Sequence, residues 1–150
     1  MYHAIVRHRA RGIFESLERG DWEAATADVA DDVTHIFSGD HPLGGERHSR
    51  EAMQRWFQRV FRLYPRLEFE VHRVSAKGWP WDTWVAVEWS DRGEAADGVP
   101  YVNHGAHWIR LRWGKAVYIH AYLDTQVVEE SCRRMAAAGI EEAAAPPISS

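Results

Sequence analysis

The sequence predicts an α+β fold, in which helices come before a run of antiparallel strands. Residues 2–64 contain stretches whose apolar residues are three or four apart, which is typical of amphipathic helices. From residue 67 onward apolar and polar residues alternate, as in strands with one solvated face. Helices gathered ahead of such strands favour an α+β architecture over a parallel α/β one.

Two helices are predicted at the N-terminus. The apolar residues within 2–17 form one stripe of a helix that ends at Gly20. Asp21 can cap a second, short helix over residues 22–29. The acidic pair at 31–32 is expected to break that helix.

A short strand and a third helix follow. Residues 33–37 alternate as in a strand, and the next stretch, SGDHPLGGERHS, is dense in turn residues. Ser49 offers an N-cap for a helix that ends before Pro65. One face of this helix carries Met53, Trp56, Phe57, Val60, Phe61 and Tyr64.

The second half of the chain is predicted to be mostly strand. A tight turn at 113–115 joins the last two strands, and residues 91–100 are expected to form an acidic loop. Residues 127–136 can form a closing helix. The predicted strands cover 67–71, 81–89, 101–113 and 117–123.

Length and composition fit one domain over residues 1–142, followed by a flexible tail over 143–150. A chain of 150 residues suits a single core, and the Ala/Pro/Ser-rich tail has no periodic apolar face. Eight tryptophans indicate a thick core or the wall of a ligand cavity.

Charge and cysteine content restrict the partners and the compartment. A formal net charge of −4 argues against nucleic acid, which needs a basic surface. Cys132 is the only cysteine, so no intrachain disulfide can form, and we expect a cytoplasmic protein. The N-terminus lacks the apolar stretch of a signal sequence and no segment approaches about 20 apolar residues, so we expect no membrane partner.

Two phrases carry a family resemblance. They are LERGDWEAATADVADDVTHIFSGDHPLGGERHSREAMQRWF near the front and HWIRLRWGKAVYIHAYLDTQ near the end. With the element order, they resemble the SnoaL-like branch of the nuclear transport factor two-like superfamily over about residues 2–135. The resemblance implies a cone, in which a curved sheet wraps around a long helix and holds one apolar pocket. Its members include polyketide cyclases, ketosteroid isomerases, epoxide hydrolases, dehydratases and proteins that only bind or dimerise.

Two histidines are the main catalytic candidates. His35 shares a strand face with Val33 and Phe37, so it follows them into the pocket, where an imidazole can act as general acid or base. His107 shares a face with Asn103 and lies about where the resemblance to ketosteroid isomerases implies a hydrogen-bond donor to the substrate oxygen. The alternative for both is a structural histidine.

The last strand is ambiguous because its two faces cannot line the same pocket. Asp124 with His120 can form an acid/base pair at the rim, or Asp124 can simply cap the closing helix. We expect substrate-binding residues at Phe37, Trp56, Phe57, Trp89, Asn103 and His120.

Metal and cofactor sites are not expected. His104 and His107 point to opposite faces of a strand, and His3 and His8 diverge on a helix. The sequence also lacks a Gly-rich phosphate loop.

Three functions remain open. The first is a cofactor-independent enzyme that cyclises or isomerises a small, largely apolar carbonyl or cyclic compound, with His35 and His107 as base and donor. The second is a non-catalytic binding or dimerisation module. The third is epoxide or ester hydrolysis, for which Asp124 is the ready candidate. A homodimer through the outer sheet face is also expected, because Trp84 and Trp108 need cover.

Overall fold

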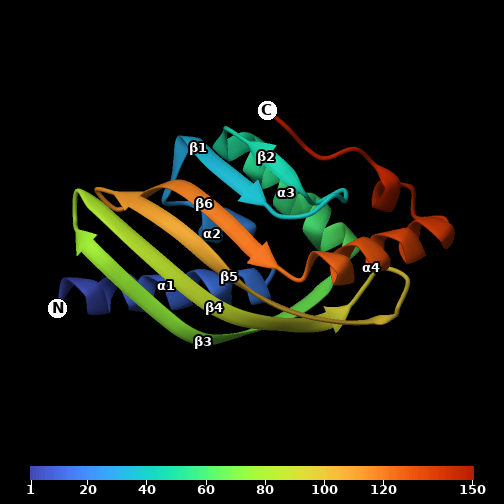
Figure 1. Cartoon of the computed structure of the whole chain (residues 1–150), viewed down its shortest axis with the longest axis horizontal. Helices are drawn as coiled ribbons and strands as arrows, with labels where there is room; N and C mark the ends of the chain where they lie inside the picture. Colours follow the sequence, from blue (N-terminus) through green and yellow to red (C-terminus); the bar gives the residue numbers. More distant parts are fainter.

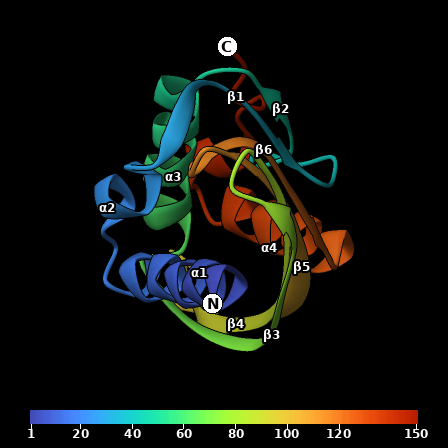
Figure 2. The same ribbon diagram turned by 90° about the vertical axis from the view of Figure 1, so that its left-hand side faces the viewer.

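The computed structural model describes residues 1–150, and its strands form one six-stranded sheet. The strands are β1 (Val29–Phe37), β2 (Gly45–Arg47), β3 (Arg66–Trp79), β4 (Asp82–Glu94), β5 (Pro100–Arg112) and β6 (Lys115–Leu123). Their order is β2-β1-β6-β5-β4-β3, in which β1 and β6 pair in parallel and all other neighbours are antiparallel. The sheet curves without closing into a barrel (Figure 2).

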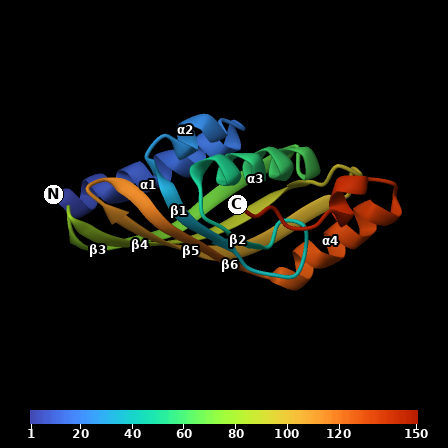
Figure 3. The same ribbon diagram turned by 90° about the horizontal axis from the view of Figure 1, so that it is seen from above.

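The helices are α1 (Tyr2–Glu18), α2 (Trp22–Thr26), α3 (Arg50–Leu63) and α4 (Thr125–Ala137), with a 3₁₀ turn η1 (Glu141–Ala144) near the C-terminus. Figure 1 shows α4 at the end of the sheet opposite the N-terminus. Helices α1 and α3 lie on the same side of the sheet (Figure 3). The predicted α+β class and the cone-like arrangement are therefore confirmed.

Polar caps fix where two of the helices begin. The Asp21 side chain accepts a hydrogen bond from the Ala24 N–H, and Ser49 accepts one from the Ala52 N–H, each at 3.1 Å. Such caps satisfy backbone donors that have no partner inside the helix. Both capping predictions are confirmed.

Strand β1 begins earlier than the sequence pattern predicts. The acidic pair Asp31 and Asp32 was expected to break a helix, but it lies within β1, and α2 ends at Thr26. The pairing with β6 shifts register between Val29 and Thr34, which leaves both carboxylates exposed. A bulge of this kind lets two consecutive residues face solvent, so strict alternation fails here.

Strand β4 also runs longer than predicted. Residues 91–94, assigned to a loop by their acidic and glycine content, continue the strand, and only 95–99 connect β4 to β5. Asp91 pairs with Phe69 of β3 and with Asn103 of β5. The ladder on both sides holds these polar residues in extended conformation, which overrides their low strand propensity.

The C-terminal residues contact the rest of the molecule. The Arg47 Nε donates to the Ile148 carbonyl at 3.1 Å, and Arg59 donates to the Pro146 carbonyl at 2.8 Å. Ala143 is buried and Ile148 packs against the core. The segment expected to be a flexible tail therefore has contacts that its composition did not suggest.

No helix in the structure combines the length and the apolar character needed to cross a bilayer.

Candidate active site

A cavity of about 160 Å³ lies between the concave face of the sheet and helices α1 and α3. Of its 32 lining residues, 26 are hydrophobic. The remaining six fall into two groups. Arg9, Asp28 and Gly114 are at least partly exposed, whereas His35, Asp91 and His107 are inside the molecule. Chemistry within the cavity therefore depends on the second group.

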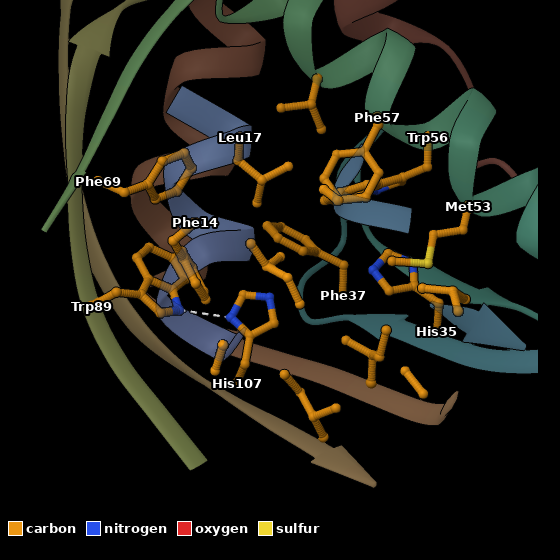
Figure 4. A pocket seen from close by; sticks show the side chains of 18 of the residues that line it. Phe14, Leu17, His35, Phe37, Met53, Trp56, Phe57, Phe69, Trp89 and His107 are labelled. Atoms are coloured by element: carbon orange, nitrogen blue, oxygen red, sulfur yellow. Dashed lines mark hydrogen bonds between the residues drawn. The ribbon is translucent and has the colours of Figure 1, made fainter. Parts of the chain in front are cut away.

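Strand register brings the two histidines to the same side of the sheet. His35 on β1 pairs with Ile119 of β6, and His107 on β5 pairs with Ala121 of β6. One strand therefore separates them, and both side chains point into the cavity. Figure 4 shows the two rings with Phe37 between them in that view.

Trp89 fixes the orientation of His107. Its indole Nε1 donates a hydrogen bond to the His107 Nδ1 at 2.7 Å (Figure 4). Gly105, paired with Trp89 across the strands, makes room for the indole, because a Cβ there would lie 3.0 Å from the ring and 2.3 Å from the Tyr122 carbonyl. An indole N–H can only donate, so Nδ1 must accept and the ring proton lies on Nε2.

Arg47 fixes the orientation of His35 in the same way. Its guanidinium NH1 lies 2.7 Å from the His35 Nδ1 and can only donate. The guanidinium is fully buried, and its other hydrogen bonds go to the carbonyls of Gly44 and Ile148. His35 therefore also carries its proton on Nε2. No protein group accepts a hydrogen bond from Nε2 of His35 or of His107.

Both imidazoles are neutral at physiological pH. Burial lowers the pKa of His107 to about 4, and the nearby His120 adds to the effect. Burial and the Arg47 charge hold the pKa of His35 well below its ordinary value of 6.5. The cavity thus contains two neutral N–H donors, and His35 presents a donor to it because Arg47 occupies the free lone pair on Nδ1.

Asp91 is the one carboxyl group buried in the cavity. It is 8% exposed, and its Oδ1 has no hydrogen-bond partner. Burial raises the pKa of Asp91 from 3.8 to about 7, an effect that the nearby backbone N–H groups of Asp91 and Asn103 only partly offset. A carboxyl poised near neutrality in a cleft is suited to general acid or base catalysis.

Several predicted binding residues do line the cavity. Phe37, Trp56, Phe57 and Trp89 are among its walls. The Trp56 indole is held by a 2.7 Å hydrogen bond to the Leu43 carbonyl. Its ring lies edge-on to His35 at 4.7 Å between centroids. These aromatic residues therefore line the same cavity as His35 and His107.

Three other predicted site residues lie elsewhere. Asp124 is exposed at the N-cap of α4, makes no capping hydrogen bond with its side chain, and does not line the cavity. His120 faces away from the cavity and contacts Ser38 and Tyr118. Asn103 is buried, but its amide is used by Tyr101, by the Asp124 carbonyl and by the His104 N–H. The predicted pair of Asp124 and His120 is therefore not brought to the cavity.

Two residues of the site, Asp91 and Arg47, are not among the predicted site residues. Asp91 has the same strand parity as Val87 and Trp89, so extending their alternation by one step would have found it. Arg47 lies in a turn-rich stretch, where no sequence pattern signals a buried guanidinium.

The structure contains no group of three or more His, Cys, Asp or Glu side chains placed to hold a metal ion.

Comparisons with known proteins agree with the fold. The family described as "SnoaL-like domain" matches residues 10–119. No curated protein sequence matches the chain. Three similar solved structures show the shared fold. An NTF2-like protein of unknown function from Burkholderia pseudomallei is 21% identical, with 78% of this chain and 88% of that chain covered and a TM-score of 0.69.

The other two structures are more distant in sequence. Bal32a, from a soil-derived mobile gene cassette, is 15% identical, with coverages of 81% and 91% and a TM-score of 0.70. TerC, co-crystallised with polyporic acid, is 16% identical, with coverages of 79% and 90% and a TM-score of 0.64.

Proposed function

The chain belongs to the SnoaL-like family, and from this premise we propose that its cavity carries out cofactor-independent acid/base chemistry on a small, largely apolar carbonyl or cyclic compound. The observation that carries the proposal is the buried carboxyl of Asp91, whose Oδ1 has no hydrogen-bond partner and which shares one apolar cavity with two neutral imidazole donors. Isomerisation and cyclisation are the reactions that this set of groups suits best.

The proposed mechanism assigns one role to each group. The Asp91 carboxylate removes a proton from the carbon next to the substrate carbonyl, and the electron pair of that C–H bond moves onto the carbonyl oxygen. The Nε2–H groups of His35 and His107 donate to this oxygen as its negative charge develops. Donors fixed in advance stabilise such charge most where water is excluded.

The intermediate then has two possible fates. In an isomerisation, Asp91 returns the proton to a different carbon of the same conjugated system. In a cyclisation, the carbanion attacks a second carbonyl of the substrate, and the new alkoxide takes the proton. Each route conserves the proton that Asp91 removes and needs no oxidant or metal.

The nature of the cavity supports an apolar substrate. Its walls are aromatic and aliphatic, and TerC, which shares the fold, was co-crystallised with polyporic acid. Hydrolysis through Asp124 has less support, because that carboxylate is exposed and lies outside the cavity.

Solvent deuterium exchange tests the proposal without knowledge of the natural substrate. The protein is incubated in D₂O with a panel of cyclic ketones, and incorporation next to the carbonyl is followed by mass spectrometry. We expect enhanced exchange that falls about 100-fold or more in Asp91→Asn and is unchanged in Asp124→Asn. Ketones that bind without any exchange would support the binding-module alternative instead.

We also propose a homodimer through the outer face of the sheet. On this face the Trp84 ring contacts those of Trp108 and Tyr118, with centroids 6.1 and 5.8 Å apart. Trp108 is 47% and Tyr122 48% exposed, which leaves apolar surface uncovered in one chain. Sedimentation at micromolar concentration tests this, and a monomer there would contradict it.

A cytoplasmic location is proposed on chemical grounds. Cys132 is the only cysteine and is buried, so the fold uses no disulfide that would require an oxidising compartment.

A further inference from the structure

Three exposed tryptophans lie together at the end of the molecule that carries the N-terminus. Trp79, Trp81 and Trp113 are 62%, 54% and 74% exposed. The rings of Trp79 and Trp81 are stacked with centroids 6.1 Å apart, and Trp81 lies 6.3 Å from Trp113. We call these residues the tryptophan tip. Surfaces of soluble domains seldom expose so many large apolar side chains together.

The tryptophan tip is built from two hairpin turns that are tied to each other and to α1. The Trp113 N–H of the β5–β6 turn donates to the Pro80 carbonyl of the β3–β4 turn at 2.8 Å. The His3 Nε2 lies 2.7 Å from the Gly78 carbonyl. Figure 1 shows both turns beside the N-terminal end of α1. The three tryptophans are therefore held as one surface.

The backbone conformation at Trp113 indicates that the indole does not stabilise the fold. Its φ is +50°, in the left-handed region that such turns normally fill with Asn or Gly. The indole covers no core, because it is the most exposed of the three. Trp113 is a bulky residue at a backbone position that disfavours bulky residues, and its indole makes no core contacts. We infer that this side chain has a role at the surface.

Positive charge surrounds the tryptophan tip. Residues 1–14 contain Arg7, Arg9 and Arg11 and no acidic residue. The two hairpins add Lys77, Arg110, Arg112 and Lys115. Two carboxylates pair with some of these residues, Asp28 with Arg9 and Lys115, and Asp82 with Arg110. The other four basic residues, Arg7, Arg11, Lys77 and Arg112, form no ion pair, in a chain whose formal net charge is −4.

The cavity approaches the surface at the same end. Its exposed lining residues include Arg9, Ile13 and Asp28, and Arg9 and Asp28 form an ion pair of 2.6 Å. Gly114, which directly follows Trp113, also lines the cavity. The tryptophan tip thus lies next to the one part of the cavity wall that carries exposed charged groups.

We propose that the tryptophan tip docks on the surface of an anionic phospholipid membrane. Indole rings partition to the interface between headgroups and acyl chains, and lysine and arginine near the surface are attracted to anionic lipids. A second copy of this chain fits less well, because two such ends would bring like charges together. Docking of this kind needs no membrane-spanning segment, and it places the exposed part of the cavity wall near the bilayer, where apolar compounds concentrate.

This proposal does not rest on the chemistry of Asp91. A protein that only binds its ligand would use the same surface, so the two proposals are tested separately.

Vesicle co-sedimentation of the full chain tests the docking. Vesicles of phosphatidylcholine alone are compared with vesicles that also contain phosphatidylserine. We expect binding to the mixed vesicles with a blue shift of tryptophan emission, and weaker binding in high salt. The triple substitution Trp79→Ala, Trp81→Ala and Trp113→Ala should weaken binding about tenfold or more. Val99→Ala, an exposed apolar residue of the β4–β5 connection at the other end of the sheet, serves as the control and should bind as the wild type does.

A second variant tests the charge independently. Lys77→Gln with Arg112→Gln should weaken binding to the mixed vesicles about 30-fold, because each basic residue near the surface contributes on the order of 1 kcal/mol. Thermal melting of every variant checks that it folds. Absence of wild-type binding to either vesicle, or equal binding by the triple variant, would overturn the proposal. So would a tryptophan tip that proves to join two copies, seen as a dimer that only the triple variant dissociates.

Discussion

The guanidinium of Arg47 and the imidazole of His35 are in direct contact, with NH1 and Nδ1 2.7 Å apart and both side chains almost fully buried. No carboxylate contacts this guanidinium, whose hydrogen bonds go to His35 and two backbone carbonyls. Burial lowers the pKa of Arg47 only to about 10, so it remains charged at neutral pH. A buried cation therefore sets the tautomer of a cavity histidine, and its charge adds to the burial that lowers the pKa of that histidine.

Replacing Arg47 should therefore cost stability and also change His35. Arg47→Met leaves His35 Nδ1 and two carbonyls without donors, so we expect a loss of about 3 kcal/mol in the free energy of unfolding, measured in urea. Removal of the positive charge should also raise the pKa of His35, which ¹⁵N NMR can follow. Arg133→Met, an exposed arginine of α4, is the control. A variant as stable as the wild type would contradict the contact network.

The tautomers of both cavity histidines are a second prediction. We expect ¹⁵N NMR at pH 7 to show neutral rings with the proton on Nε2 for His35 and His107. Trp89→Phe removes the indole donor, so Nδ1 of His107 should lose its partner and the ring should become a mixture of tautomers. A proton on Nδ1 of either ring in the wild type would leave a lone pair facing the cavity and restore the general-base role.

Acid should destabilise the fold through His107. Its pKa is about 4 in the folded protein and 6.5 ordinarily, so the unfolded chain binds the proton more readily. The associated stability is complete above about pH 6.5 and is lost as the pH falls toward 4, by up to about 1.4 kcal/mol per pH unit. His107→Gln should lose less stability than the wild type between those pH values. His8→Gln on the exposed side of α1 should behave as the wild type.

Removal of the C-terminal residues tests the role of that segment. Its Ala/Pro/Ser-rich composition predicts a dispensable tail, whereas its carbonyls at Pro146 and Ile148 accept hydrogen bonds from Arg59 and Arg47. From these contacts we expect deletion of residues 146–150 to lower the melting temperature by several degrees. An unchanged melting temperature would show that the tail is flexible in solution, as the composition indicates.

Much of the fold could be predicted because local signals agree with the tertiary structure. The stripes of α1 and α3, the caps at Asp21 and Ser49, and the turn before Lys115 each follow from spacing and residue type. The boundaries of β1 and β4 could not, because sheet pairing on both sides holds acidic residues in strands that their propensities disfavour.

The candidate site, like the fold, was predicted only in part from the sequence. Parity placed His35 and His107 on the inner face of the sheet, since each shares a strand with residues that must be buried. The roles of those histidines depend on Arg47 and Trp89, which approach from other strands, and no pattern within a strand reveals such a partner. Asp124 and His120 could not be placed from the sequence, because strand parity alone does not say which face of β6 lies inward.

Replacing Asp91 should lower activity and raise stability. Its pKa is raised from 3.8 to about 7 in the folded protein, so the fold loses stability as the pH rises from about 4 to 7, by up to about 1.4 kcal/mol per pH unit. Asp91→Asn removes this cost, so we expect the stability of the variant relative to the wild type to be about 3–4 kcal/mol greater at pH 8 than at pH 4. Thermal denaturation at the two pH values provides the comparison.

The ionisation of Asp91 itself tests the proposed site most directly. A ¹³C NMR titration of its carboxyl carbon in the free protein, assigned by comparison with Asp91→Asn, measures the pKa without any substrate. The proposed base in the cavity predicts a midpoint near 7. A midpoint near the ordinary value of about 4 would mean that solvent or a cation reaches the carboxylate, and it would contradict the assignment of Asp91 as the base.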